Sequence, residues 1–321
     1  MFDVVDSQFS LSDAHVRSFR RDGFVKLSSF LTVEFVRYIR SRITDRMALL
    51  DEGQIGFKRV GYDIFEDDPA VEELLSREIF ARSLTLLTGR HLFFAQGLGF
   101  ELEKNKHNGF PWHIGTQSFG YQRAGDYGCS MWVPLDPIDT AGQGGGMSYV
   151  PEHIVSGQFM YDFVDPAIDS TLVEMVKEEE CLSLQEFAEL RHGILNSPAM
   201  TKLLDFNRRS DDFKLGDVLF FNKRVIHASE LLGEGPLQTR CAFVMRFIGM
   251  DSRYDRRRAL GLEFPRSQFG HKPQSEFHLN VCKEDGELIS ESPYFRNQAR
   301  RRLLAGQDHL PSESSGCLNR Q

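Results

Sequence analysis

The sequence lacks long hydrophobic runs, and its cysteines form no recognisable pattern. None of its 321 residues falls in an apolar run of 18, so we expect no transmembrane helix. The first ten residues carry acids instead of a basic stretch and an apolar block, which argues against a secretory signal peptide. The five cysteines include no Cys-x-x-Cys pair, so we expect neither a disulfide framework nor a structural zinc site. Reduced thiols of this kind are typical of a cytoplasmic protein.

Basic residues are outnumbered by acidic ones. Lys and Arg total 38 against 46 Asp and Glu, which gives a formal net charge of −8. Nucleic-acid-binding proteins more often carry a net basic surface, so we expect no nucleic-acid partner. The same charge weakly disfavours docking to an acidic carrier protein. A free small molecule is therefore the expected substrate type, with a carrier-tethered one as the alternative.

Apolar residues at helical spacing dominate the first third of the chain. Ser12 can cap a helix that ends near Gly23, and Thr32 can cap a second one whose apolar stripe reaches Leu50. A third helix is predicted over 69–88, where Gly89 provides a natural stop.

Short apolar segments separated by Gly, Pro and Asp follow these helices. Strands are predicted over 91–103, 128–135, 146–150, 217–221 and 240–248. Such strands favour a sandwich or a closed double sheet. A helical pattern over about 159–213 interrupts them, and an insertion of this size is typical of a lid or substrate wall, with cover for a sheet edge as the alternative. The polar residues 307–321 are expected to form a flexible tail.

Two of the ten histidines stand in apolar surroundings. His113 follows a predicted strand, and His227 begins a new element after the apolar segment 217–221. Two imidazoles on neighbouring strands can converge on one metal ion, and imidazole suits Fe, Zn or Cu. The alternative is that both rings are buried and satisfied by backbone carbonyls. Polar neighbours place the following histidines at the surface: His15, His192, His271, His278 and His309.

Two arginines lie in a strand that otherwise reads as apolar. Arg240 and Arg246 are six residues apart, so alternation places both on one face of the sheet. A guanidinium inside a barrel is suited to bidentate binding of a carboxylate. An outward face with two solvated charges is the alternative that the sequence leaves open.

Taken in order, these segments resemble the phytanoyl-CoA dioxygenase family of Fe(II)- and 2-oxoglutarate-dependent oxygenases. The matching segments, within about 89–254, are Trp112-His113, Trp132-Val133-Pro134-Leu135-Asp136, Gly145-Gly146-Met147-Ser148-Tyr149-Val150-Pro151-Glu152-His153, Gly216-Asp217, His227-Ala228-Ser229 and Arg240. The resemblance implies one oxygenase domain over 1–306, mainly β with α. Its core would be a double-stranded β-helix of the jelly-roll or cupin type, with N-terminal helices and the helical insertion.

The same resemblance implies roles for individual residues. His113 and His227 would bind Fe(II), and Arg240 would hold the distal carboxylate of 2-oxoglutarate. Ser229 and Gln96 stand where the family often places further contacts to that cosubstrate. The enzyme would use O2 to oxidise an unactivated C–H bond in a small biosynthetic metabolite.

One position departs from the usual pattern of the family. Most members carry His-x-Asp or His-x-Glu, where the acid completes a ligand set of two histidines and one carboxylate, whereas this chain has Gly115. In this respect it resembles the non-haem iron halogenases, in which Arg246 also matches a second basic position. A halide would then take the free position, and chlorination would be the favoured reaction. The alternatives are a hydroxylase of the same family and a non-catalytic binding protein with a degenerate site.

Overall fold

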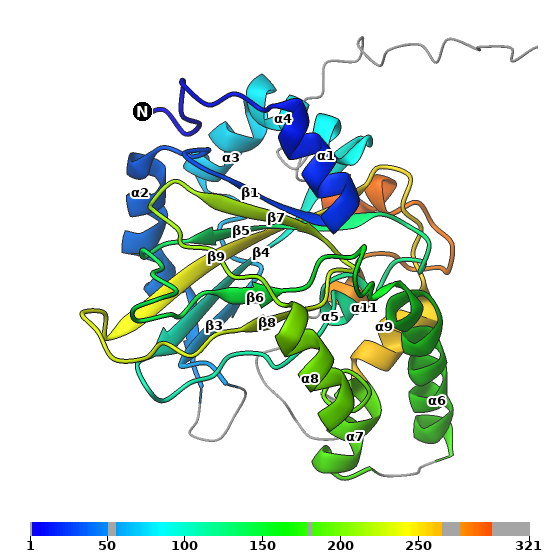
Figure 1. Ribbon diagram of the computed structural model, residues 1–321. Coiled ribbons are helices and arrows are strands. Elements are labelled where there is room, and N and C mark those ends of the chain that lie inside the picture. Colours follow the sequence, from blue (N-terminus) through cyan, green and yellow to red (C-terminus); the bar gives the residue numbers. More distant parts are fainter. Residues whose placement is uncertain (1, 51–55, 179–181, 265–276, 297–321) are drawn as a thin grey trace, which may run out of the picture.

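An antiparallel sheet of seven strands forms the centre of the computed structural model, which describes residues 2–50, 56–178, 182–264 and 277–296 (Figure 1). In spatial order its strands are β1 (Phe24–Leu27), β7 (Val218–Asn222), β5 (Gly128–Pro134), β9 (Thr239–Gly249), β4 (Leu92–Glu103), β3 (Arg59–Tyr62) and β2 (Ala48–Leu49). A second sheet pairs β6 (Met147–Tyr149) with β8 (His227–Ser229). Isolated bridges extend this small sheet from His227 to His113 and from Tyr149 to Arg209.

A layer of apolar side chains lies between the two sheets. Trp132 of β5 and Leu219 of β7 belong to the same buried cluster as Met147 and Tyr149 of β6. Two antiparallel sheets that share a core in this way form a double-stranded β-helix. The expected fold, mainly β with α, is confirmed, and the five predicted strands begin and end within one residue of their expected bounds.

The N-terminal helices cover the outer face of the large sheet (Figure 1). They are α1 (Asp13–Asp22), α2 (Val33–Ile43), the 3-10 helix η1 (Thr44–Arg46), α3 (Pro69–Ser76) and α4 (Glu78–Thr88). As predicted, the Ser12 and Thr32 side chains cap α1 and α2, and Gly23 ends α1 with a φ of 80°. These local signals orient each helix so that its apolar stripe packs against the sheet.

Two of the helix predictions are wrong in their bounds. The second helix ends at Ile43 instead of reaching Leu50, because the chain turns through η1 into β2, which pairs with β3. The third is broken at Arg77, whose backbone is extended. A straight helix that buries Leu74 and Leu75 would next bury Ile79, yet Ile79 is exposed and Phe80 is buried instead. The break at Arg77 rotates the apolar side of the second helix relative to the first. The apolar sides of both helices therefore face the same core.

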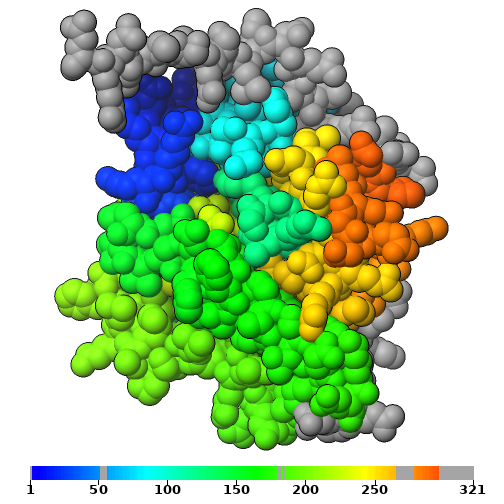
Figure 2. Space-filling model, turned by 90° about the vertical axis from the view of Figure 1, so that its right-hand side faces the viewer, coloured from blue at the N-terminus to red at the C-terminus, as the bar shows by residue number. Residues whose placement is uncertain are grey.

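Further helices lie between β6 and β7 and after β9. They are the π-helical turn η2 (Met160–Val164), α6 (Asp165–Lys177), α7 (Leu184–His192), α8 (Pro198–Asn207), α9 (Arg256–Leu262), α11 (Phe277–Asn280), the 3-10 helix η3 (Ile289–Glu291) and α12 (Pro293–Arg296), while a short α5 (Thr116–Phe119) precedes β5. Helix α6 packs against α9 where green meets yellow in Figure 2. Within the described ranges, no helix has the length and apolar character needed to cross a bilayer. The predicted tail over 307–321 lies outside the described residues.

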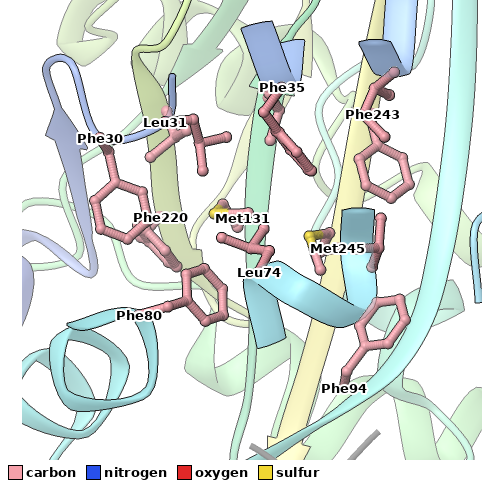
Figure 3. Packing of buried hydrophobic residues seen from close by; sticks show 14 of the residues in the cluster. Phe30, Leu31, Phe35, Leu74, Phe80, Phe94, Met131, Phe220, Phe243 and Met245 are labelled. Carbon is pink, nitrogen blue, oxygen red and sulfur yellow. The ribbon is translucent and has the colours of Figure 1, made fainter. Parts of the chain in front are cut away.

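Strand β9 runs between β5 and β4 and has a different chemistry on each face. Its residues Phe243 and Met245 enter the main core, where they meet Phe35 and Leu74 from the N-terminal helices (Figure 3). The alternate residues Arg240, Ala242, Val244 and Arg246 face the opposite way, toward the small sheet. The sheet therefore separates an apolar core on one side from two buried guanidinium groups on the other.

Gly97 on β4 leaves no space for a side chain. A Cβ atom there would collide with the backbone oxygen of Ile64, which cannot rotate away, and would lie 3.2 Å from Phe243. We expect Gly97→Ala to lower the free energy of unfolding by about 1–3 kcal/mol, as overpacking commonly does. Urea denaturation measures this change. Gly125→Ala is the control, because nothing lies within 4 Å of a Cβ at that position; equal midpoints for the two variants would contradict the prediction.

Candidate functional site

His113 and His227 face each other in the small sheet. The backbone nitrogen of each donates to the carbonyl oxygen of the other at 2.9 Å, and their ring centroids are 4.1 Å apart. The two residues come from segments more than 100 positions apart in the chain. The fold therefore brings together the pair that the sequence singled out.

The hydrogen bonds of the two rings determine which nitrogen is protonated. Nδ1 of His113 lies 2.8 Å from the Pro111 carbonyl oxygen, and Nδ1 of His227 lies 2.8 Å from that of Val225. A carbonyl oxygen can only accept, so both Nδ1 atoms carry hydrogen and both Nε2 atoms keep a lone pair. Burial lowers the pKa of His113 to about 4 and that of His227 well below its usual value. Two neutral imidazoles oriented by carbonyls are the usual donors of a metal site.

Arg240 brings a positive charge into the cavity beside these rings. The cavity has a volume of about 610 Å³ including solvent at its mouth, and its lining includes His113, His227 and Ser229. Arg240 is 2% exposed, lies 5.7 Å from the Trp132 ring centroid, and has no hydrogen-bond partner for Nε among the described residues. Burial lowers its pKa to about 10, so the guanidinium stays charged at neutral pH. A buried charge of this kind is suited to an anionic ligand.

The other predicted site residues divide between this cavity and a larger one. Ser229 lines the smaller cavity, and its Oγ accepts from the Phe110 nitrogen at 3.1 Å. Gln96 lines the larger cavity, where its Oε1 accepts from Arg246 at 2.8 Å and its Nε2 donates to Asp63 at 2.8 Å. Arg246 lines both cavities. The sequence left open whether Arg240 and Arg246 face inward or outward. In the structure both side chains face inward and are buried.

Gly115 lies in a tight turn at the start of α5. Its nitrogen donates to the Lys223 carbonyl oxygen at 2.9 Å. A Cβ atom at Gly115 would lie 2.9 Å from both that oxygen and the Phe119 ring. No three His, Cys, Asp or Glu side chains gather as a metal-binding group in the part of the chain that the structure describes. The donor set thus fits an iron centre in which two imidazoles are the protein's ligands and no carboxylate joins them.

The larger cavity contains polar residues that sequence reasoning did not assign to a site. It has a volume of about 1110 Å³ including solvent at its mouth, and its lining includes Tyr62, Thr116, Asp165, Arg191, His192 and His278. The expectation that His192 and His278 lie at the surface is wrong, because both line this cavity. His271 and His309 lie outside the described residues. A capping box at Ser183 and Glu186 begins α7, but no local signal shows which side of that helix meets the cavity.

Acidification should weaken the fold through its buried histidines. Burial lowers the pKa of His192 to about 4. The unfolded chain, with a histidine pKa of about 6.5, therefore binds more protons between pH 6.5 and 4, and the free energy of unfolding falls as the pH falls. Burial raises the pKa of Asp165 to about 6, which acts in the opposite direction over the same range.

We expect the melting temperature of His192→Gln to decrease less between pH 7 and 4.5 than that of the parent protein, because one unfavourable protonation is removed. Differential scanning calorimetry measures the two profiles. His91→Gln is the control, since His91 is exposed. Parallel profiles for the parent and His192→Gln would contradict this assignment.

Comparison with known proteins identifies the fold. No family model matches the sequence, and no curated protein matches it. The α-ketoglutarate-dependent epimerase SnoN from nogalamycin biosynthesis is 16% identical, with a TM-score of 0.53 over 75% of this chain and 84% of that chain. The carbocyclase SnoK from the same biosynthesis is 18% identical, with a TM-score of 0.54 over 76% and 87%. EctD from S. alaskensis, in its apoform, is 14% identical, with a TM-score of 0.51 over 80% and 85%. At these identities the chain shares their double-stranded β-helix fold, and the resemblance to phytanoyl-CoA dioxygenases and halogenases stays a prediction.

Proposed function

We propose that this protein is an Fe(II)- and 2-oxoglutarate-dependent enzyme that oxidises an unactivated C–H bond in a small molecule. The observation that carries the proposal is the position of Arg240. Its buried guanidinium lines the same cavity as His113 and His227, whose Nε2 atoms are available to a metal ion. Two imidazoles beside a buried cation that makes no ion pair among the described residues match the needs of a cofactor that combines iron with a dicarboxylate.

The chain's own residues would divide the work as follows. His113 and His227 would bind iron, and the carbonyls behind them hold both rings in orientation. Arg240 would bind the distal carboxylate of 2-oxoglutarate, with Ser229 as a hydroxyl donor nearby. Arg246, held by Gln96, would separate this cofactor cavity from the larger cavity, where the substrate would bind. When bound, iron and 2-oxoglutarate supply the activation of O2.

We propose chlorination as the favoured outcome of this chemistry. The support is Gly115, since the structure's described residues offer no carboxylate to complete the ligand set, and a halide can take that place. Hydroxylation by the same centre is the rival outcome, with water in that position. Placement of the substrate carbon relative to the halide would then decide the product.

The first experiment is an anaerobic titration of the protein with Fe(II) and 2-oxoglutarate, recorded by visible absorption. We expect a charge-transfer band that shifts when chloride is added. Arg240→Gln should weaken 2-oxoglutarate binding about tenfold or more, because it removes a charged hydrogen-bond donor. Arg209→Gln is the control, since Arg209 lines neither of the two cavities. A band indifferent to chloride would favour hydroxylation, and no band at all would overturn the proposal.

Replacement of Gly115 tests the halide position. Because any side chain at this position meets close contacts, two variants must be compared to separate a loss of stability from an effect on the halide. We expect Gly115→Ala and Gly115→Asp to lose about 1–3 kcal/mol of stability alike, because each adds a Cβ against the Lys223 backbone. Only Gly115→Asp adds a carboxylate, so only this variant should lose the chloride-dependent shift of the band. Thermal melts and titrations of both variants measure the two effects. A chloride response retained in Gly115→Asp would contradict the open-position hypothesis.

A further inference from the structure

Arg191 on α7 brings a second buried guanidinium into the larger cavity. It is 5% exposed and lines that cavity. One of its terminal nitrogens, Nη2, donates to Asp169 at 2.7 Å, while Nη1 is buried without a hydrogen-bond partner among the described residues. An unpaired charged donor of this kind is costly unless something accepts from it. The cavity is the space from which such an acceptor can come.

The nearby acids leave one nitrogen of this group without an acceptor among the described residues. Asp169 is shared, because Arg258 Nε also lies 3.4 Å from its other oxygen. Asp165, another acid that lines this cavity, accepts a hydrogen bond from Thr116 and makes no hydrogen bond to Arg191 among the described residues, although its charge acts on both Arg191 and Arg258. The two acids therefore balance much of the charge of the two guanidinium groups. What they leave open is an acceptor for Nη1 of Arg191, and an anionic oxygen can supply it.

Hydrogen bonds fix the insertion to the segment that carries the first histidine. The Asn196 side chain donates to the Trp112 carbonyl oxygen at 2.8 Å, and Trp112 Nε1 donates to Asp205 at 3.2 Å. Arg191, His192 and His113 line the same cavity. Arg191 is therefore held at a defined position relative to the proposed metal site.

Apolar side chains from several segments also line the larger cavity. They are Phe100, Phe110, Ile114, Met160, Leu195 and Leu262. A ligand that satisfies this surface has an apolar portion beside His113 and a polar end at Arg191.

We propose that Arg191 binds an anionic oxygen group, a carboxylate or a phosphate, at one end of the substrate. The apolar portion of the substrate then lies beside His113. The proposal rests on the proposed function in that it takes the larger cavity as the substrate site. Arg191 is a binding residue in this scheme and takes no part in the oxidation.

Isothermal titration of the iron-free protein with four six-carbon probes tests the proposal. The probes are hexanoate, hexyl phosphate, hexanamide and hexylammonium, which share the apolar chain and differ in charge. We expect hexanoate or hexyl phosphate to bind at least tenfold more tightly than hexanamide, and the tighter of the two identifies the group. Equal affinity for hexanoate, hexyl phosphate and hexanamide, or tightest binding of hexylammonium at Asp165, would overturn the proposal without any variant.

Variants then locate the bound anion. Arg191→Lys can keep the ion pair with Asp169 but lacks the second nitrogen, so it should weaken binding of the anionic probe about tenfold to one-hundredfold and leave hexanamide unchanged. Arg59→Lys is the matched control, because Arg59 also pairs with a buried carboxylate, Glu101, and lines neither cavity. Unchanged binding in Arg191→Lys would overturn the proposal, and a loss in Arg240→Gln instead would place the anion in the cofactor cavity.

A parallel titration with Fe(II) and 2-oxoglutarate separates the two proposals. Arg191→Lys should keep the charge-transfer band of the parent protein, because Arg191 does not line the cofactor cavity. If the parent shows no band but the preference for anionic probes depends on Arg191, the proposed function fails and the anion site remains. If the band forms but the probes show no preference, only the anion site fails.

Discussion

Strand β9 carries apolar side chains on one face and two arginines on the other, and the rest of the molecule is arranged around this difference. On the apolar face, Phe243 and Met245 support the packing of the N-terminal helices. On the other face, Arg240 and Arg246 are buried between the sheets. Burying two guanidinium groups carries a desolvation cost that apolar packing elsewhere must offset. The main core stabilises the sheet, and the charged face is available for ligands.

The small sheet holds the two histidines that we propose as metal ligands at a defined separation. His113 and His227 are joined by their own backbone hydrogen bonds, so the distance between the rings follows from sheet geometry. The carbonyls of Pro111 and Val225 then set the orientation of both rings. No third side chain is needed to hold the two rings in this arrangement. At Gly115 the chain packs too closely to leave space for a side chain.

The insertion between β6 and β7 contributes one wall of the larger cavity. Asp165 at the start of α6 meets Thr116, and Trp112 meets Asp205 of α8. These contacts attach the insertion to the segment that contains His113. The length of the insertion suggested either a substrate wall or cover for a sheet edge. Arg191 and His192 of α7 line the larger cavity, so the insertion forms part of a cavity wall.

Local sequence signals determined the helix caps and the five predicted strands. They also singled out the two histidines and two arginines that line the smaller cavity. These signals act between residues close in the chain: a serine caps the turn that follows it, and alternation places Arg240 and Arg246 on one face. Only the tertiary structure decided that this face is inward, that the helix over 69–88 breaks at Arg77, and that Gln96 joins the larger cavity. It alone brought Arg191, His192 and His278 to the proposed substrate site. Segments far away in the chain build the environment of each of these residues. The residues next to them in the sequence therefore give no signal from which that environment could be predicted.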